Sequence, residues 1–172
     1  MVNISLIGLG QRGQATLERL ARLPNANVLV KCDVESDWRD AATHPEVDLV
    51  WICTPWEWHM RMAVTAMQAG KDVALEVPAA MTVADCERLV SVARETGRHC
   101  VMLENCCYDT FHQGVLAMER EGLFGELTHA EGAYIHDLRD KDDTRQSKGW
   151  MTHLCRQHKG NPYPTHGIGP VC

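Results

Sequence analysis

The 172-residue sequence has no long hydrophobic run, no CxxC pair and no excess of basic residues. No stretch approaches the roughly 20 apolar residues that a membrane-spanning helix needs, so we expect no membrane partner. Asp and Glu number 23 against 17 Lys and Arg, and the net charge of −6 gives no electrostatic reason to expect nucleic acid as a partner. The hydrophobic fraction of 45% and the charged fraction of 23% are typical of a soluble globular protein.

The eight cysteines also exclude several classes of protein. Without a CxxC pair, a zinc ribbon or a thioredoxin-like redox site is not expected. Cys106 and Cys107 are adjacent, which suits neither tetrahedral metal spacing nor a disulfide between the two. We therefore predict reduced structural thiols and no metal site. The N-terminus shows no secretory signal, which predicts a cytoplasmic protein, or a periplasmic or secreted one if the N-terminus is incomplete.

Short apolar runs alternate with helical patterns along most of the chain, as in proteins built on a parallel sheet. Strands are predicted at 2–7, 28–32, 48–53, 72–76 and 99–103, and helices at 11–23, 58–69, 82–97 and 109–121. Residues 126–135 alternate like a further strand with one buried face. The predicted fold class is α/β, with a Rossmann-type doubly wound parallel sheet in residues 1–122. Residues 123–172 are predicted to begin an α+β second domain that is incomplete here.

A glycine-rich turn follows the first predicted strand and opens the first helix. Gly8, Gly10 and Gly13 match G-x-G-x-x-G, and Asp33 follows the second strand. In dinucleotide-binding folds the glycines allow a tight turn, close approach to a pyrophosphate and close helix packing, while the acid binds the ribose hydroxyls. This pattern predicts an NAD site, although Arg12 leaves a 2′-phosphate, and hence NADP, open. The alternative is a glycine turn with no ligand.

Only a short segment separates Asp33 from the next strand at Asp48. It has room for one short helix near residues 37–42, so we infer that an edge strand is missing or replaced by a loop. The strand at 28–32 would then become the edge of the sheet.

An aromatic turn follows the third predicted strand, with the sequence Cys53-Thr-Pro-Trp-Glu-Trp-His59. Ligands of open α/β sheets bind at this end of the strands. Together with Gly70-Lys-Asp-Val and Glu76-Val-Pro78, this turn resembles the Gfo/Idh/MocA oxidoreductase family. Most of that family carries Glu-Lys-Pro with a catalytic lysine, whereas this chain has Val77.

Further motifs narrow the resemblance. The segments 53–59, 76–81, 102–108, 131–137 and 160–170 resemble glycoside hydrolase family 109, whose members are NAD-dependent α-N-acetylgalactosaminidases. The resemblance covers nearly the whole chain and implies that the chain is the N-terminal part of a longer enzyme. It also implies a small-molecule or glycan substrate carrying α-N-acetylgalactosamine, and a homo-oligomer formed through the second domain.

The family resemblance implies hydrolysis with retention and no net redox change. NAD oxidises C3 of the sugar, a base removes the C2 proton, the C1 oxygen leaves, water adds, and the hydride returns to C3. Such an enzyme needs no pair of carboxylates flanking the bond. The implied cofactor contacts are Gln11, Arg12, Asp33, Trp56, Glu57, Trp58, His59, Glu76, Val77 and Asn105.

The same resemblance implies a substrate site in the last part of the chain. Its implied contacts are Tyr134, Tyr163, Pro164, Thr165 and His166. We assign proton transfer to His166 and Tyr163, since tuned tyrosine and histidine side chains supply that chemistry. Tyr134 is expected to bind substrate, with an acid–base role open to it, and Glu104 to orient the group.

Two other functions stay open at this point. One is a sugar oxidoreductase that releases an oxidised product, and the absence of a lysine at Val77 argues against it. The other is an NAD-binding fragment with no activity of its own. The short link after Asp33 favours that alternative, as does Met151, which stands where the family pattern has arginine.

Overall fold

The computed structural model describes residues 1–136, 150–157, 160–161 and 163–172. It divides into two compact units, Met1–Leu103 and Glu104–Cys172. The predicted boundary after Gly122 lies downstream of this division and stays a prediction. The predicted exposed loop at 137–149 falls outside the described residues. No described helix has the length and apolar character needed to cross a membrane.

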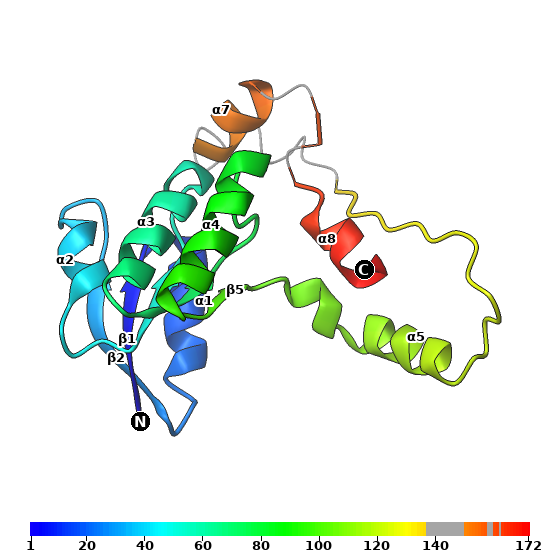
Figure 1. The fold of residues 1–172 in the computed structure, drawn as a ribbon, viewed down its shortest axis with the longest axis horizontal. Helices are drawn as coiled ribbons and strands as arrows, with labels where there is room; N and C mark the ends of the chain where they lie inside the picture. Colours follow the sequence, from blue (N-terminus) through cyan, green and yellow to red (C-terminus); the bar gives the residue numbers. More distant parts are fainter. Residues whose placement is uncertain (137–149, 158–159, 162) are drawn as a thin grey trace. The chain divides into compact units, whose positions relative to one another are not determined.

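The first unit is a parallel five-stranded sheet, as predicted (Figure 1). Its strands are β1 (Val2–Ile7), β2 (Ala26–Cys32), β3 (Leu49–Ile52), β4 (Asp72–Leu75) and β5 (Cys100–Met102), in the order β2-β1-β3-β4-β5. Among the described strands β2 pairs with β1 alone and is therefore one edge of the sheet, as the short link predicted. The strand order reverses between β1 and β3, and ligands bind at such a point in open α/β sheets.

Helices connect the parallel strands, and such crossovers are right-handed in nearly all proteins. α1 (Gln11–Leu20) joins β1 to β2 in one direction across the sheet. α2 (Trp38–Thr43), α3 (Trp56–Gln68) and α4 (Val83–Thr96) return in the other direction. Right-handed connections then place α1 on one face and the other three helices on the opposite face, where α3 packs against both α2 and α4. The sheet is therefore doubly wound.

The main core lies between the sheet and α3. β-branched and leucine side chains of β3 and β4 meet small or flexible side chains of α3, as buried parallel strands require. The fully buried members include Val50, Ile52, Val73, Leu75, Ala63, Ala66 and Met67. α4 begins where the sequence predicts, because the Thr82 hydroxyl accepts from the Asp85 N–H at 3.1 Å, and it ends at Gly97 in the left-handed region.

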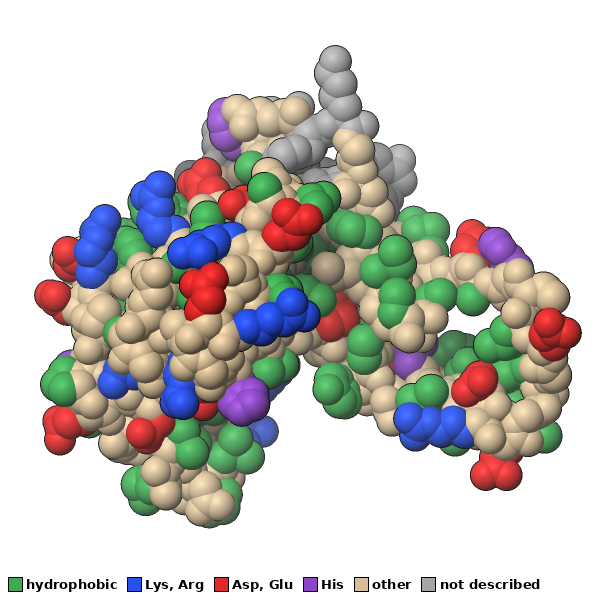
Figure 2. Space-filling model, in the orientation of Figure 1, with side chains coloured by type: hydrophobic (Ala, Val, Ile, Leu, Met, Phe, Trp, Pro, Cys, Tyr) green, Lys and Arg blue, Asp and Glu red, His purple; other side chains and the backbone are tan. Residues whose placement is uncertain are grey.

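The second unit holds shorter elements. They are the 3₁₀ helices η1 (Asn105–Tyr108) and η2 (Gly169–Val171) and the helices α5 (Thr110–Arg120), α7 (Trp150–Gln157) and α8 (Thr165–Ile168). α5 has no buried residue, and Figure 2 shows hydrophobic side chains exposed on the second unit, while charged ones are interspersed over the first. The prediction of a strand at 126–135 is wrong, because these residues form no strand. A strand needs a hydrogen-bonded neighbour, and no described residue of this unit forms one.

Candidate functional site

The glycine turn at the end of β1 has the shape that a dinucleotide pyrophosphate requires. Gly8 has φ +94°, and a Cβ there would lie 2.6 Å from the Cys53 carbonyl oxygen. A Cβ on Gly13 would lie 1.9 Å from the Gly8 carbonyl oxygen. A Cβ on Gly10 would instead meet nothing within 4 Å, so this glycine faces open space. The first two glycines pack the turn, and Gly10 leaves room for a ligand.

α1 begins at this turn with its N-terminal amides available. Gly10 is the N-cap and supplies no side-chain hydrogen bond, and the first turn of the helix carries no acidic residue. The free N–H groups and the positive end of the helix dipole therefore attract phosphate. These residues fit a dinucleotide pyrophosphate.

Asp33 joins the glycine turn to the end of β2. Its Oδ2 accepts from the Leu9 N–H at 2.9 Å, and its Oδ1 accepts from the Val34 N–H at 2.8 Å. The carboxylate is half-buried, and each oxygen retains lone-pair capacity for a ribose hydroxyl. The structure thus places the predicted acid beside the predicted turn.

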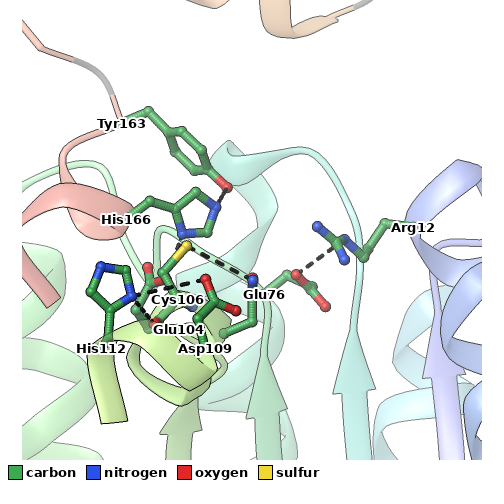
Figure 3. Close-up of polar contacts among 9 residues, drawn as sticks. Arg12, Glu76, Glu104, Cys106, Asp109, His112, Tyr163 and His166 are labelled. Atoms are coloured by element: carbon green, nitrogen blue, oxygen red, sulfur yellow. Dashed lines mark hydrogen bonds and ion pairs between the residues drawn. The ribbon is translucent and has the colours of Figure 1, made fainter. Parts of the chain in front are cut away.

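Arg12 and Glu76 come together, although both were predicted from separate motifs. Arg12 Nε lies 3.5 Å from Glu76 Oε2, with 44% and 14% of the two side chains exposed (Figure 3). This ion pair directs the guanidinium toward the loop after β4. Arg12 is thereby partly neutralised, which weakens the case for its use on a 2′-phosphate. Gln11 is exposed at the start of α1.

The aromatic turn after β3 forms the first turn of α3. Trp56 is buried, Glu57 is exposed and Trp58 is half-buried. Val77, in the loop after β4, is buried with 4% of its surface exposed. An apolar buried valine holds no proton, so the position of the family's lysine carries no acid–base group here.

His59 is fully buried and links two loops. Its Nδ1 lies 2.8 Å from the Pro78 carbonyl oxygen, and its Nε2 lies 2.9 Å from the Thr54 carbonyl oxygen. Burial lowers the pKa of the imidazole below its usual 6.5, while the two carbonyl contacts act in the opposite direction. His59 is buried and both ring nitrogens face carbonyl oxygens, so the geometry gives it a positioning role between the loops after β3 and β4. The cofactor contact expected for it from the sequence stays a prediction.

The second unit assembles a chain of hydrogen bonds from a half-buried tyrosine to a buried glutamate (Figure 3). Glu104 Oε1 lies 2.5 Å from His166 Nδ1, and His166 Nε2 lies 2.7 Å from the Tyr163 hydroxyl. His166 and Glu104 are 5% and 6% exposed. Because an ionised carboxylate only accepts, Nδ1 carries the proton and Nε2 accepts from the Tyr163 hydroxyl. The chain is therefore oriented from tyrosine through histidine to glutamate.

Local structure holds each member of this chain in place. Glu104 caps η1, and its Oε1 also accepts from the Cys106 N–H at 3.0 Å. His166 lies in α8, and Tyr163 lies just before the N-cap of that helix, Pro164, so the chain entering α8 brings the two side chains together. A Cβ on Gly169 would lie 2.8 Å from Glu104 Cγ, so glycine lets the backbone of η2 approach the glutamate.

Tyr134 lies beside the same cluster. Its ring centroid is 4.4 Å from that of His166 and 6.0 Å from that of Tyr163, and the tyrosine is 47% exposed. It reaches this position because Gly132 and Gly167 allow two backbone segments to cross, since a Cβ on Gly132 would lie 1.8 Å from the Gly167 carbonyl oxygen. The three residues predicted for catalysis are thus neighbours.

The other predicted residues of this unit lie outside the hydrogen-bonded chain of Tyr163, His166 and Glu104. Asn105 is exposed and its amide donates to Cys106 Sγ at 3.9 Å. Pro164 is exposed, and Thr165 Oγ1 is buried with no hydrogen-bond partner in the part of the chain that the structure describes. Sequence reasoning missed His136, whose ring centroid lies 4.3 Å from that of Tyr134, because nothing in its spacing links it to the site. The side chain of Met151 lies outside the described residues.

Comparison with known proteins gives the class first. Residues 3–104 match the Gfo/Idh/MocA family, described as an oxidoreductase family with an NAD-binding Rossmann fold, and the chain belongs to it. Residues 108–172 match the C-terminal domain of glycosyl hydrolase 109. Within the wider family, the chain is therefore recognised as related to glycosyl hydrolase 109.

Individual relatives agree with this assignment. The whole chain is 46% identical to a glycosyl hydrolase family 109 protein of Phocaeicola vulgatus and 43% identical to an alpha-N-acetylgalactosaminidase of Bacteroides fragilis. The chain spans 49% and 48% of their lengths, about half in each case. The alignments run over 202 positions, so both relatives carry extra segments within the aligned region.

A solved structure supports the fold. Scyllo-inositol dehydrogenase from Lactobacillus casei, with bound NAD(H) and scyllo-inositol, superposes with a TM-score of 0.68 over 74% of this chain and 43% of that chain. At 19% identity, this similarity bears on the fold alone.

Proposed function

We propose that this chain carries the cofactor site and the proton-transfer residues of an NAD-dependent glycoside hydrolase that acts on terminal α-N-acetylgalactosamine. The observation that carries the proposal is the Tyr163–His166–Glu104 chain of hydrogen bonds, in which the histidine and the glutamate are buried. Its support comes from the family, since the relative from Bacteroides fragilis is named as an alpha-N-acetylgalactosaminidase.

The cofactor would be held by the first unit. Gly10 and the N-terminal amides of α1 would receive the pyrophosphate, and Asp33 would receive the ribose hydroxyls. NAD, when bound, supplies reversible oxidation of the sugar, which acidifies the proton on the neighbouring carbon.

The second unit would supply the proton transfers. When the Tyr163 hydroxyl passes its proton to His166 Nε2, the phenolate oxygen is the base that takes the acidified sugar proton. The carboxylate of Glu104 stabilises the resulting imidazolium through the Nδ1 hydrogen bond. The Tyr163 hydroxyl can then give a proton to the leaving oxygen and take back the proton held by His166, so both groups return to their starting states. Addition of water uses the same transfers in reverse, with the water proton removed and a proton returned to the sugar carbon. The transfer between Tyr163 and His166 uses a hydrogen bond that is already formed.

A sugar oxidoreductase is the second candidate, because the family and its fold are those of oxidoreductases. That reaction is expected to use the lysine of the family's Glu-Lys-Pro motif. Val77 occupies this position as a buried apolar residue, which favours the glycosidase.

The two functions differ in one measurable product. The chain, supplied with NAD and p-nitrophenyl α-N-acetylgalactosaminide, is expected to release p-nitrophenol with no net accumulation of NADH. Tyr163→Phe and His166→Asn should each lower the rate by at least about 100-fold, as expected on loss of a general acid or base. Steady accumulation of NADH would favour the oxidoreductase, and absence of both signals would leave only an NAD-binding fragment.

A further inference from the structure

Three different metal-binding side chains meet in the second unit. The carboxylate of Glu104, the thiol of Cys106 and the imidazole of His166 each offer one ligand atom, and these atoms all lie within 4.8 Å of one another (Figure 3). Glu104 and His166 are buried, and Cys106 is 9% exposed. The family's chemistry accounts for the histidine and the glutamate, but it gives no role to the thiol.

The two carboxylate oxygens of Glu104 differ in their hydrogen bonds. Its Oε1 accepts from His166 Nδ1 and from the Cys106 N–H, whereas its Oε2 is buried and has no hydrogen-bond partner among the described residues. A buried carboxylate oxygen without a partner is costly, because it has lost its hydration and gained no hydrogen bond in exchange. A bound cation would satisfy it.

We propose that Glu104, Cys106 and His166 form a binding site for a thiophilic divalent cation of the zinc class. Zinc combines thiolate, imidazole and carboxylate ligands in tetrahedral sites, whereas magnesium and calcium prefer oxygen ligands alone. Three protein ligands leave a fourth position for water.

Binding releases one proton to solvent, from Cys106 Sγ. The cation takes the place of the proton on His166 Nδ1, and that proton moves to Nε2 of the same ring, so the imidazole stays neutral. The side chains of Glu104 and His166 must separate slightly, because metal bonds of about 2.0–2.3 Å place two ligand atoms farther apart than a hydrogen bond does. Their position in short elements, with Glu104 capping η1 and His166 in α8, leaves this movement local.

Occupation of the site has a consequence that rests on the proposed function. With a metal on Nδ1, the neutral imidazole carries its single proton on Nε2 and becomes a donor there. The Tyr163 hydroxyl then loses the acceptor that takes its proton. The cation would therefore stop proton transfer, and the site would be inhibitory.

The binding experiment uses cobalt(II) as the probe, because its bond to a thiolate gives a charge-transfer absorption. The full chain and the control Cys86→Ser, whose altered residue is exposed in the first unit, should bind one cobalt ion with this absorption, and zinc should displace it. Cys106→Ser should lose the absorption, and Glu104→Gln should bind at least tenfold more weakly. Circular dichroism confirms that each variant is folded, and Glu104→Gln decides the question if Cys106→Ser does not fold.

Two results would overturn the site. One is the absence of a thiolate–cobalt absorption in the unaltered chain, and the other is an absorption that survives in Cys106→Ser. In a separate activity measurement, zinc should lower the hydrolysis rate of the unaltered chain and of Cys86→Ser, each relative to its metal-free rate, and Cys106→Ser should lose this effect. If no hydrolysis occurs at all, the proposed function fails, while the cobalt spectrum still decides whether the metal site exists.

Discussion

Replacing Gly13 by alanine should destabilise the first unit strongly. The new Cβ would lie 1.9 Å from the Gly8 carbonyl oxygen, which is a backbone atom. The Cβ itself is bonded directly to the backbone of α1. Neither atom can turn away as the end of a flexible side chain could, so the turn and α1 must separate. Overpacking of this kind costs typically 1–3 kcal/mol, and we expect about 3 kcal/mol because the clash is with backbone. For a chain of this length that loss lowers Tm by about 6–12 °C.

Replacing Gly10 by alanine should leave the stability of the first unit nearly unchanged and weaken the binding of NAD. Its φ of −65° suits any residue, and its Cβ would meet nothing within 4 Å. The unfolding free energy should therefore change by less than about 1 kcal/mol. The methyl group would occupy the space that we assign to the pyrophosphate. NAD affinity should fall at least tenfold, which corresponds to about 1.4 kcal/mol of binding free energy.

The pair of variants separates folding from binding. Urea denaturation gives the change in unfolding free energy, and isothermal titration with NAD gives the affinity. If the Gly13→Ala variant is as stable as the unaltered chain, the claim that Gly13 packs against the Gly8 carbonyl is wrong. Gly10→Ala that binds NAD with unchanged affinity would refute the assignment of the cofactor to this loop.

Three further predictions concern the first unit. His59→Gln should lower the unfolding free energy by about 1–3 kcal/mol, because at least one of two buried carbonyl contacts is lost. Burial lowers the pKa of His59, so below about pH 6.5 the unfolded chain binds a proton that the folded chain does not, and the unfolding free energy falls with the pH. Urea denaturation from pH 7 to 5 should show a smaller fall in this free energy for His59→Gln than for the unaltered chain. An equal fall in both would contradict this reading. Burial, reinforced by the charge of Glu76, raises the pKa of Cys53 to about 12. Iodoacetamide at pH 8 should therefore label the exposed Cys86 and leave Cys53 unlabelled until the chain is denatured. Equal labelling of the two cysteines in the folded chain, measured by mass spectrometry, would contradict this prediction. Asp33→Asn replaces one of two accepting oxygens with a donor, so NAD titration should show at least tenfold weaker binding, and unchanged affinity would exclude the ribose contact.

Local sequence patterns were sufficient for the first unit. Its strands are short apolar runs bounded by turns, and the helix at Thr82 carries a capping residue, so each element is specified by neighbouring residues. The missing edge strand could also be predicted, because the link between Asp33 and Asp48 is too short for it. The role of His59 could not, since its spacing in the aromatic turn gives no sign that both ring nitrogens face carbonyl oxygens.

The second unit depended on information that local patterns do not contain. The alternation at 126–135 is real, but a strand also needs a hydrogen-bonded neighbour, and no described residue of the unit supplies one. The contact between Glu104 and His166 joins residues that are 62 positions apart. The family resemblance indicated these residues, whereas the thiol of Cys106 beside them became visible only in three dimensions.

The central claim is that the second unit breaks a glycosidic bond by removing a proton from the sugar, and solvent deuterium tests it most directly. N-acetylgalactosamine released by the chain with NAD in deuterated water should carry deuterium at C2, because the proton taken by Tyr163 is exchanged with solvent before the product is completed. Mass spectrometry and proton magnetic resonance measure this incorporation. Release of the sugar with hydrogen fully retained at C2 would contradict the account.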